Sequence, residues 1–122
     1  MNKWLASITL TSVLLLPAAA QAAPLPKPSA FAMCGVCHTV TKDGPSALGP
    51  NLFGIEGRPA GSLPKFAYSP AMKASGIKWN KEQLLAFVSN PKAKVPGNRM
   101  AYTGLKNPKD AEAVVNYLLS LK

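Results

Sequence analysis

Cys34-Gly35-Val36-Cys37-His38 places two thiols one helical turn apart, with an imidazole directly after the second thiol. This spacing is the attachment pattern of a c-type haem. Both cysteines can reach the edge of one porphyrin and bond its vinyl groups, and the histidine then lies under the ring, where a nitrogen can meet the iron. The segment therefore predicts a covalently attached haem, with His38 as an iron ligand.

Three other uses of a Cys-x-x-Cys segment fit the sequence less well. A redox-active dithiol normally accompanies a βαβ pattern, and the sequence has none. A disulfide is natural in an exported protein, but the loop that it would close here is too small to stabilise the fold much. A structural zinc ion needs four ligands, whereas the chain has only two cysteines and one histidine. The dithiol remains the main alternative to a haem.

The second axial ligand of the iron has to come from another kind of residue, because His38 is the only histidine in the chain. The sixth position is taken by a methionine, taken by another group, or open. Met33 is too close to His38 in sequence to reach the opposite face of the ring. Met72 is expected on a short helix, where filling a gap in the core is its ordinary role. Met100 follows His38 by 62 residues in a non-helical stretch, which favours Met100.

The rest of the chain shows helical signals and loops, with no strand pattern. Residues 41–70 are dominated by Gly and Pro, and a loop of this length in a compact domain needs a surface to wrap around. Caps, prolines and apolar spacing predict helices at residues 30–34, 69–76, 80–90 and 107–121. The inward-facing positions of the two longer helices are expected to be Leu84, Phe87, Val88, Ala111, Val114, Val115, Leu118 and Leu121. The predicted fold class is all-α.

From Phe31 to Lys122 the sequence resembles the small class I cytochromes c, of the mitochondrial cytochrome c and bacterial cytochrome c2 type. The resemblance implies three main helices plus short helical turns and long loops, all wrapped around one covalently attached haem. The matching residues extend well beyond the haem motif: Cys34-Gly35-Val36-Cys37-His38-Thr39-Val40, Gly49-Pro50-Asn51-Leu52-Phe53-Gly54, Gly57-Arg58, Tyr68, Gly76-Ile77-Lys78-Trp79, Leu84, Asn90-Pro91-Lys92 and Pro96-Gly97-Asn98-Arg99-Met100.

The same resemblance implies roles for individual residues. Cys34 and Cys37 would form the two thioether bonds of haem c, and His38 and Met100 would be the axial ligands of its iron. The remaining cofactor contacts would be Pro50, which orients the histidine through its carbonyl, and Arg58, Tyr68 and Trp79, which surround the buried propionates.

Two positions depart from the family pattern. Relatives tend to have a glycine four residues before the aromatic residue of the first helix, whereas this chain has Lys27 before Phe31 and several nearby prolines. The first helix is therefore expected to be short or splayed. Phe87 stands where many relatives have a tyrosine whose hydroxyl reaches the ligand sulfur.

The 122 residues allow one domain, preceded by a segment with the features of a secretory signal. Asn2 and Lys3 come before an apolar run of 13 residues, too short to span a membrane, and Ala20-Gln21-Ala22 fits the small-x-small cleavage rule. We expect a signal peptide at residues 1–22, a monohaem domain at residues 23–122, and a location in the bacterial periplasm.

A strong positive charge bears on the choice of partner. Removal of residues 1–22 takes away only Lys3 and leaves 13 basic and 5 acidic side chains, a net charge of +8. Such an excess favours acidic surfaces, and export argues against nucleic acid. The expected partners are redox proteins with acidic docking surfaces, such as an oxidase, a reductase complex or a dehydrogenase. They would meet a monomer that associates with membranes at most peripherally, and Lys42, Lys92, Lys94 and Arg99 are the best candidates for the contact.

Imidazole and thioether ligation would close both axial positions, so that electrons pass without a substrate binding to iron. The expected function is that of a soluble periplasmic one-electron carrier, an electron-transfer protein and not an enzyme. Two alternatives are a dedicated haem c subunit of a periplasmic dehydrogenase and, if Met100 does not bind, an open-site haem protein that takes gas or peroxide.

Overall fold

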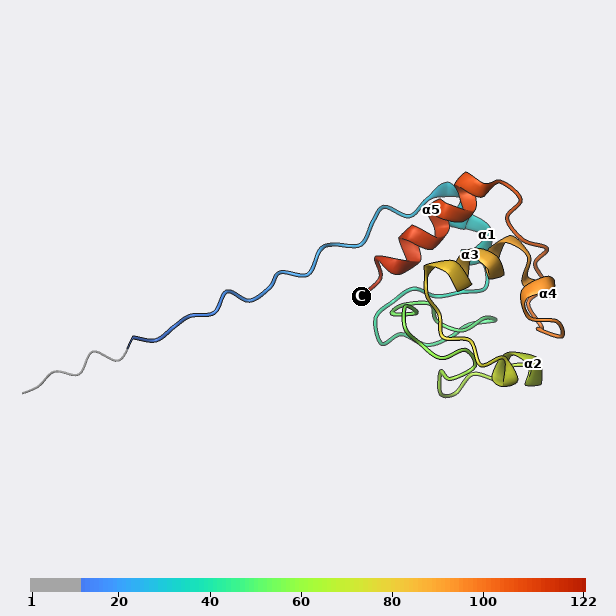
Figure 1. The fold of residues 1–122 in the computed structure, drawn as a ribbon, viewed down its shortest axis with the longest axis horizontal. Coiled ribbons are helices and arrows are strands. Elements are labelled where there is room, and N and C mark those ends of the chain that lie inside the picture. Colours follow the sequence, from blue (N-terminus) through green and yellow to red (C-terminus); the bar gives the residue numbers. More distant parts are fainter. Residues whose placement is uncertain (1–11) are drawn as a thin grey trace, which may run out of the picture.

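The computed structural model describes residues 12–122, so the first half of the expected signal segment lies outside the described residues. Residues 12–28 form an extended arm without helix or strand, and residues 12–27 are exposed. This arm leads into a helical body (Figure 1). Within the described part of the chain, no helix is both long enough and apolar enough to cross a membrane.

The helical body contains no strand between residues 12 and 122, which confirms the all-α prediction. One isolated bridge joins Pro59 to Lys78 across the long loop. In chain order the elements are the 3-10 turn η1 (Ser29–Phe31) and the helices α1 (Ala32–Gly35), α2 (Pro70–Ala74), α3 (Lys81–Ser89), α4 (Pro91–Lys94) and α5 (Pro108–Leu119).

Side-chain caps fix where the later helices start. Ser69 Oγ accepts a hydrogen bond from the Met72 amide at the start of α2 (3.0 Å). Asn80 Oδ1 accepts one from the Gln83 amide at the start of α3 (2.9 Å). Each bond satisfies an amide that the first turn of a helix leaves without an intrahelical partner.

The short helix α4 was missing from the sequence-based prediction, which treated Pro91 only as the residue that ends α3. Proline is equally suited to the first position of a new helix, because the amide that it lacks would have no partner there. Asn90 closes α3 and also caps α4, its Oδ1 accepting from the Ala93 amide (3.3 Å). The chain therefore turns at Asn90 and continues as a second helix.

The first helical segment is short, as the departure at Lys27 suggested. It consists of η1 and the four residues of α1, and it packs across α5 through Phe31. The Phe31 and Tyr117 rings meet edge to face, with centroids 5.2 Å apart. Lys27 Nζ lies 5.8 Å from the Phe31 ring centroid, within cation–π range. One buried aromatic pair thus joins the first helical segment to α5.

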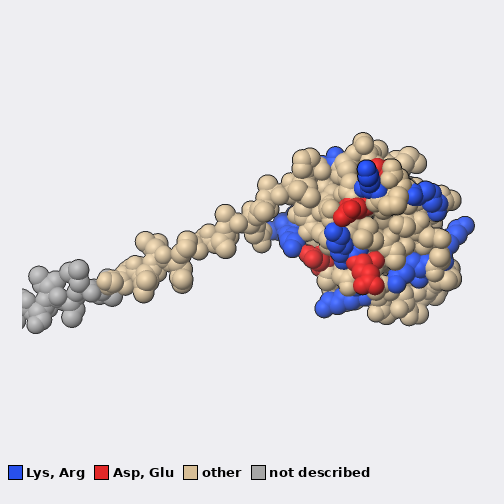
Figure 2. All heavy atoms as spheres, turned by 45° about the horizontal axis from the view of Figure 1, so that its top comes forward, with Lys and Arg blue, Asp and Glu red and all other residues tan. Residues whose placement is uncertain are grey.

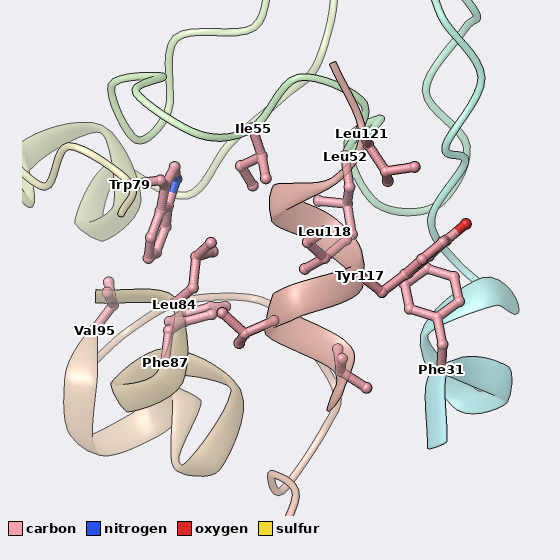
Figure 3. Packing of buried hydrophobic residues seen from close by; sticks show 12 residues of the cluster. Phe31, Leu52, Ile55, Trp79, Leu84, Phe87, Val95, Tyr117, Leu118 and Leu121 are labelled. Atoms are coloured by element: carbon pink, nitrogen blue, oxygen red, sulfur yellow. The ribbon is translucent and has the colours of Figure 1, made fainter. Parts of the chain in front are cut away.

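The core lies between α3, α5 and the first segment (Figure 3). The predicted inward positions of α5 are buried, and so are Leu84 and Phe87 on α3, whereas Val88 is half-buried. Tyr117 was not among the predicted core residues, yet it is only 5% exposed because it packs on Phe31. At one edge of this core the rings of Trp79 and Phe87 stack edge to face at 5.2 Å.

Residues 103–106 close the carboxyl end of α3. The Leu105 amide donates to Val88 O (2.8 Å), and Lys106 Nζ donates to Ser89 O (3.3 Å). Gly104 lies so close to this helix end that a Cβ there would collide with Ser89 O. Its φ of +106° is also a conformation that side chains disfavour.

We predict that Gly104→Ala lowers the free energy of unfolding by about 2 kcal/mol or more, since it combines a steric clash with a disfavoured φ. The matched control is Gly54→Ala, where φ is +66° and a Cβ would meet nothing within 4 Å. The control should cost only about 1 kcal/mol, the strain of the left-handed conformation. Denaturant unfolding of both variants measures the difference. Equal losses in the free energy of unfolding would show that the clash with Ser89 does not destabilise the protein.

Candidate haem-binding site

A cavity of about 380 Å³ opens beside the core. Its volume lies in the range of pockets that hold cofactors and other small molecules. The lining is mostly apolar. It comes from parts of residues 37–50 and 55–72, from Trp79, from Phe87 of α3 and from residues 98–101. The long loops therefore wrap around one shared cavity. A group bound in this cavity would provide the surface that loops of this length need.

The Cys-x-x-Cys-His segment approaches this cavity as a continuous helical turn. The amides of Cys37 and His38 both donate to Cys34 O, at 3.1 and 2.9 Å. Cys37 and His38 line the cavity, whereas Cys34, one turn earlier, packs against the hydrophobic core. Burial raises the pKa of the Cys34 thiol, against a smaller opposing effect of a backbone hydrogen bond.

The His38 ring is held by a hydrogen bond from Nδ1 to Pro50 O at 2.8 Å. A carbonyl oxygen can only accept, so Nδ1 carries the proton and Nε2 keeps its lone pair. Burial lowers the pKa of His38, and the bond to Pro50 opposes this only in part. The imidazole is therefore neutral at pH 7 and presents the form of Nε2 that binds metals.

Gly49 makes room for this ring orientation. A Cβ built on Gly49 would lie 2.6 Å from His38 Nδ1 and 2.9 Å from His38 Nε2. Any side chain at this position would push the imidazole away from the Pro50 carbonyl. Gly49 thus leaves room for the imidazole ring, and the carbonyl of Pro50 fixes the orientation of that ring.

Met100 reaches the cavity on a loop that a single asparagine organises. Asn98 Nδ2 donates to Pro91 O (3.0 Å) and Val95 O (2.8 Å), which ties the loop to α4. Asn98 Oδ1 accepts from the Met100 amide (2.9 Å). Asn98 is part of the family resemblance described above, but the sequence alone predicts no role for it, since an asparagine in a turn has many possible partners.

Arg58, Tyr68 and Trp79 also line the cavity. The Arg58 guanidinium donates to Asn51 O (2.8 Å) and Phe53 O (2.6 Å). Burial raises the pKa of Tyr68, while a backbone hydrogen bond from Leu63 and the nearby Arg58 oppose the rise. A cationic group is thus held beside a phenol on one wall of a mostly apolar space.

Asn51 is a second residue whose role the sequence did not reveal. It is 5% exposed, and its Nδ2 donates to Thr41 O (2.8 Å) and Gly44 O (2.9 Å). Its Oδ1 accepts from the Phe53 amide (2.8 Å). A buried asparagine with three such bonds replaces the missing secondary structure of the loop that carries Gly49 and Pro50.

The side chains around the cavity fit a haem better than a bare ion. Among residues 12–122, no three His, Cys, Asp or Glu side chains come together into a metal-binding group. One imidazole and one thioether are enough, however, for an iron whose other four ligands are porphyrin nitrogens. Cys37 could bond to the edge of such a ring, and the apolar side chains of the lining could cover its faces. Seven of the eight predicted site residues line this one cavity, and Cys34 is the exception.

Comparison with known proteins gives the same answer. The family model "Cytochrome c" matches residues 28–122. Cytochrome c2 iso-2 of Magnetospirillum fulvum is 45% identical over 94 residues, which cover 77% of this chain and 97% of the relative. Cytochrome c of Gibberella zeae is 45% identical over 85 residues, 70% of this chain and 80% of the relative.

A solved structure shares the fold as well as the sequence. Cytochrome cH from Methylobacterium extorquens superposes with a TM-score of 0.69 at 36% identity, and the match covers 74% of this chain and 90% of the other. The cavity, the Cys-x-x-Cys-His turn and these matches lead to one conclusion: the chain belongs to the cytochrome c family and is a haem-based electron carrier with a covalently bound haem c.

Proposed function

We propose that this chain is a periplasmic one-electron carrier whose haem iron is held by His38 and Met100. The observation that carries the proposal is the hydrogen bond from His38 Nδ1 to Pro50 O, which leaves Nε2 available for a metal. Met100 lines the same cavity and comes from a different part of the chain. In this arrangement Cys34 and Cys37 form the two thioether bonds.

The haem supplies the reversible gain and loss of one electron, and the chain sets the conditions for it. His38 and Met100 would hold the iron from its two sides, so no position on the iron would be left for a substrate. The mostly apolar lining would exclude water, and Arg58, Tyr68 and Trp79, which line the same cavity, would surround the propionates. The carbonyl of Pro50 keeps the imidazole in one tautomer and one orientation.

Export of the chain is supported by the part of the signal segment that the structure describes. Val13, Leu14, Leu15 and Leu16 are 78–90% exposed on the extended arm. A run of exposed apolar side chains is unfavourable in a folded soluble domain, whereas an apolar run is the central part of a secretory signal that is removed before the domain functions. The family match begins at residue 28, after the expected cleavage site.

The proposed docking surface is the region of the Cys-x-x-Cys-His turn and the Met100 loop. Met33, Val36 and Leu48 are 66%, 70% and 80% exposed there. Lys42, Lys92, Lys94 and Arg99 flank these segments in sequence, and all but the half-buried Lys94 are exposed. On the face drawn in Figure 2, acidic side chains lie among the basic ones. The ion pairs Lys81–Glu112 and Lys122–Glu56 hold two of the five acidic groups. Exposed apolar side chains, with basic residues close to them in sequence, suit a redox protein with an acidic surface.

The proposal predicts the mass and the absorbance of the protein purified from a host that exports and matures c-type haems. The mass should equal residues 23–122 plus one haem, and it should survive denaturation, because the thioether bonds are covalent. The oxidised protein should show a methionine–iron charge-transfer band. Haem that is released by denaturation would contradict the linkage, and absence of the band would contradict ligation by methionine.

Phe87→Tyr should raise the reduction potential. Phe87 lines the cavity together with Met100, so a phenol at this position can donate a hydrogen bond to the ligand sulfur and withdraw electron density from the iron. Reduced iron tolerates this loss better than oxidised iron, and hydrogen bonds to ligands are a known control on haem potentials. A hydrogen bond that stabilises the reduced protein by about 1 kcal/mol relative to the oxidised protein raises the reduction potential by roughly 40 mV.

The matched control is Phe66→Tyr, which adds the same hydroxyl at another point of the lining, where Phe66 stacks on Tyr68 with centroids 4.8 Å apart. Voltammetry on wild type and both variants, with the charge-transfer band checked in each, separates a bond to sulfur from a general gain in polarity. An unchanged or lower potential of Phe87→Tyr with the band intact would refute the expectation.

A further inference from the structure

Two thioethers, not one, line the cavity. Besides Met100, the side chain of Met72 on α2 contributes to the lining and packs against the hydrophobic core. Met33, in contrast, is 66% exposed and lies outside the cavity. The proposed function uses only one of the two sulfur atoms, so the second has no assigned role.

The backbone of Met72 is held firmly. Its amide donates to Oγ of Ser69, a residue that is 4% exposed, and its carbonyl accepts from Ser75 Oγ at 2.8 Å. Gly61 lies against the next residue of the helix, since a Cβ there would come within 2.9 Å of Lys73 Cα. Only the flexible thioether arm of Met72, with its three rotatable bonds, is therefore free to move.

The helix that carries Met72 also lies directly against the loop that carries Met100. A Cβ placed on Gly97 would be 3.2 Å from Ala71 Cβ. Figure 1 shows α2 beside the turn that follows α4. Ala71 precedes Met72, and Gly97 precedes Met100 by three residues, so both methionines extend into the cavity from one contact between two segments.

The other potential iron ligands in the lining are already used or poorly suited. We assigned Cys37 to the haem edge and His38 to the opposite axial position. Tyr68 would have to bind as a phenolate, and burial disfavours that charge. The lining contains no lysine and no second histidine. Among these side chains, Met72 is the one that can replace Met100 without any change of charge.

We propose that Met72 is a reserve axial ligand, whose sulfur binds the iron whenever the loop with Met100 moves away. The inference rests on the proposed function, in which Met100 is the resting ligand. One sulfur lone pair leaves the iron and another takes its place, so no proton or electron is exchanged. The exchange keeps the sixth position closed to small ligands such as peroxide or cyanide during excursions of the loop.

The test compares full-length haem proteins that carry Met72→Leu, Met100→Ala, both changes, or Met33→Leu with Met100→Ala as the matched control. Met72→Leu alone should keep the resting methionine–iron band and the shifted methyl resonance of the ligand. Met100→Ala, with or without Met33→Leu, should show a new methionine–iron band from Met72. The double variant Met72→Leu/Met100→Ala should lose it. If Met72 holds the site nine-tenths of the time in Met100→Ala, removing it should raise cyanide affinity about tenfold.

Identical spectra and equal cyanide affinities for Met100→Ala and the double variant would overturn the reserve role, while leaving Met100 as the resting ligand. Loss of the band in Met72→Leu alone would contradict both the reserve role and the assignment of Met100. Where Met100→Ala does not fold, Met100→Val retains more of the packing, and the same comparison in that background decides the question.

Discussion

The fold depends on filling the cavity beside its core. Residues 41–69 contain no helix or strand, and their conformation is held by turns, by Asn51 and by the loop contacts of Arg58. Such a loop buries little apolar surface against itself, and a domain of about 100 residues has little stability to spare. A covalently bound haem supplies the missing apolar surface. The proposed attachment at Cys34 and Cys37 would keep it from dissociating.

The two axial sides of the proposed site are organised by different means. On the histidine side, the backbone carbonyl of Pro50 fixes the imidazole, and Gly49 leaves space for it. On the methionine side, Asn98 binds two carbonyls around α4 and the Met100 amide at once. The histidine follows its cysteines directly and is held by one hydrogen bond to the Pro50 carbonyl, whereas the methionine lies on a loop that is held by the hydrogen bonds of Asn98. A nearby second thioether is therefore most useful on the methionine side.

Local patterns in the sequence predicted the parts of the structure that local physics determines. The haem motif, the caps at Ser69 and Asn80 and the apolar stripe of α5 depend on neighbours within a few residues. The sequence did not reveal α4, because Pro91 can either end or begin a helix. The sequence also did not predict the burial of Tyr117 or the roles of Asn51 and Asn98. These depend on contacts with distant segments or on the final shape of a turn, which composition and periodicity do not predict.

The central claim is that this chain folds around its attached haem. The most direct measurement compares helical circular dichroism and denaturant unfolding of the wild-type haem protein with those of Cys34→Ala/Cys37→Ala, which cannot form thioether bonds. The account predicts that the variant without attached haem loses most of its helical signal and its cooperative transition, since ligand binding and folding are coupled. A variant that lacks haem and still unfolds cooperatively, with the helical content of the wild type, would contradict it.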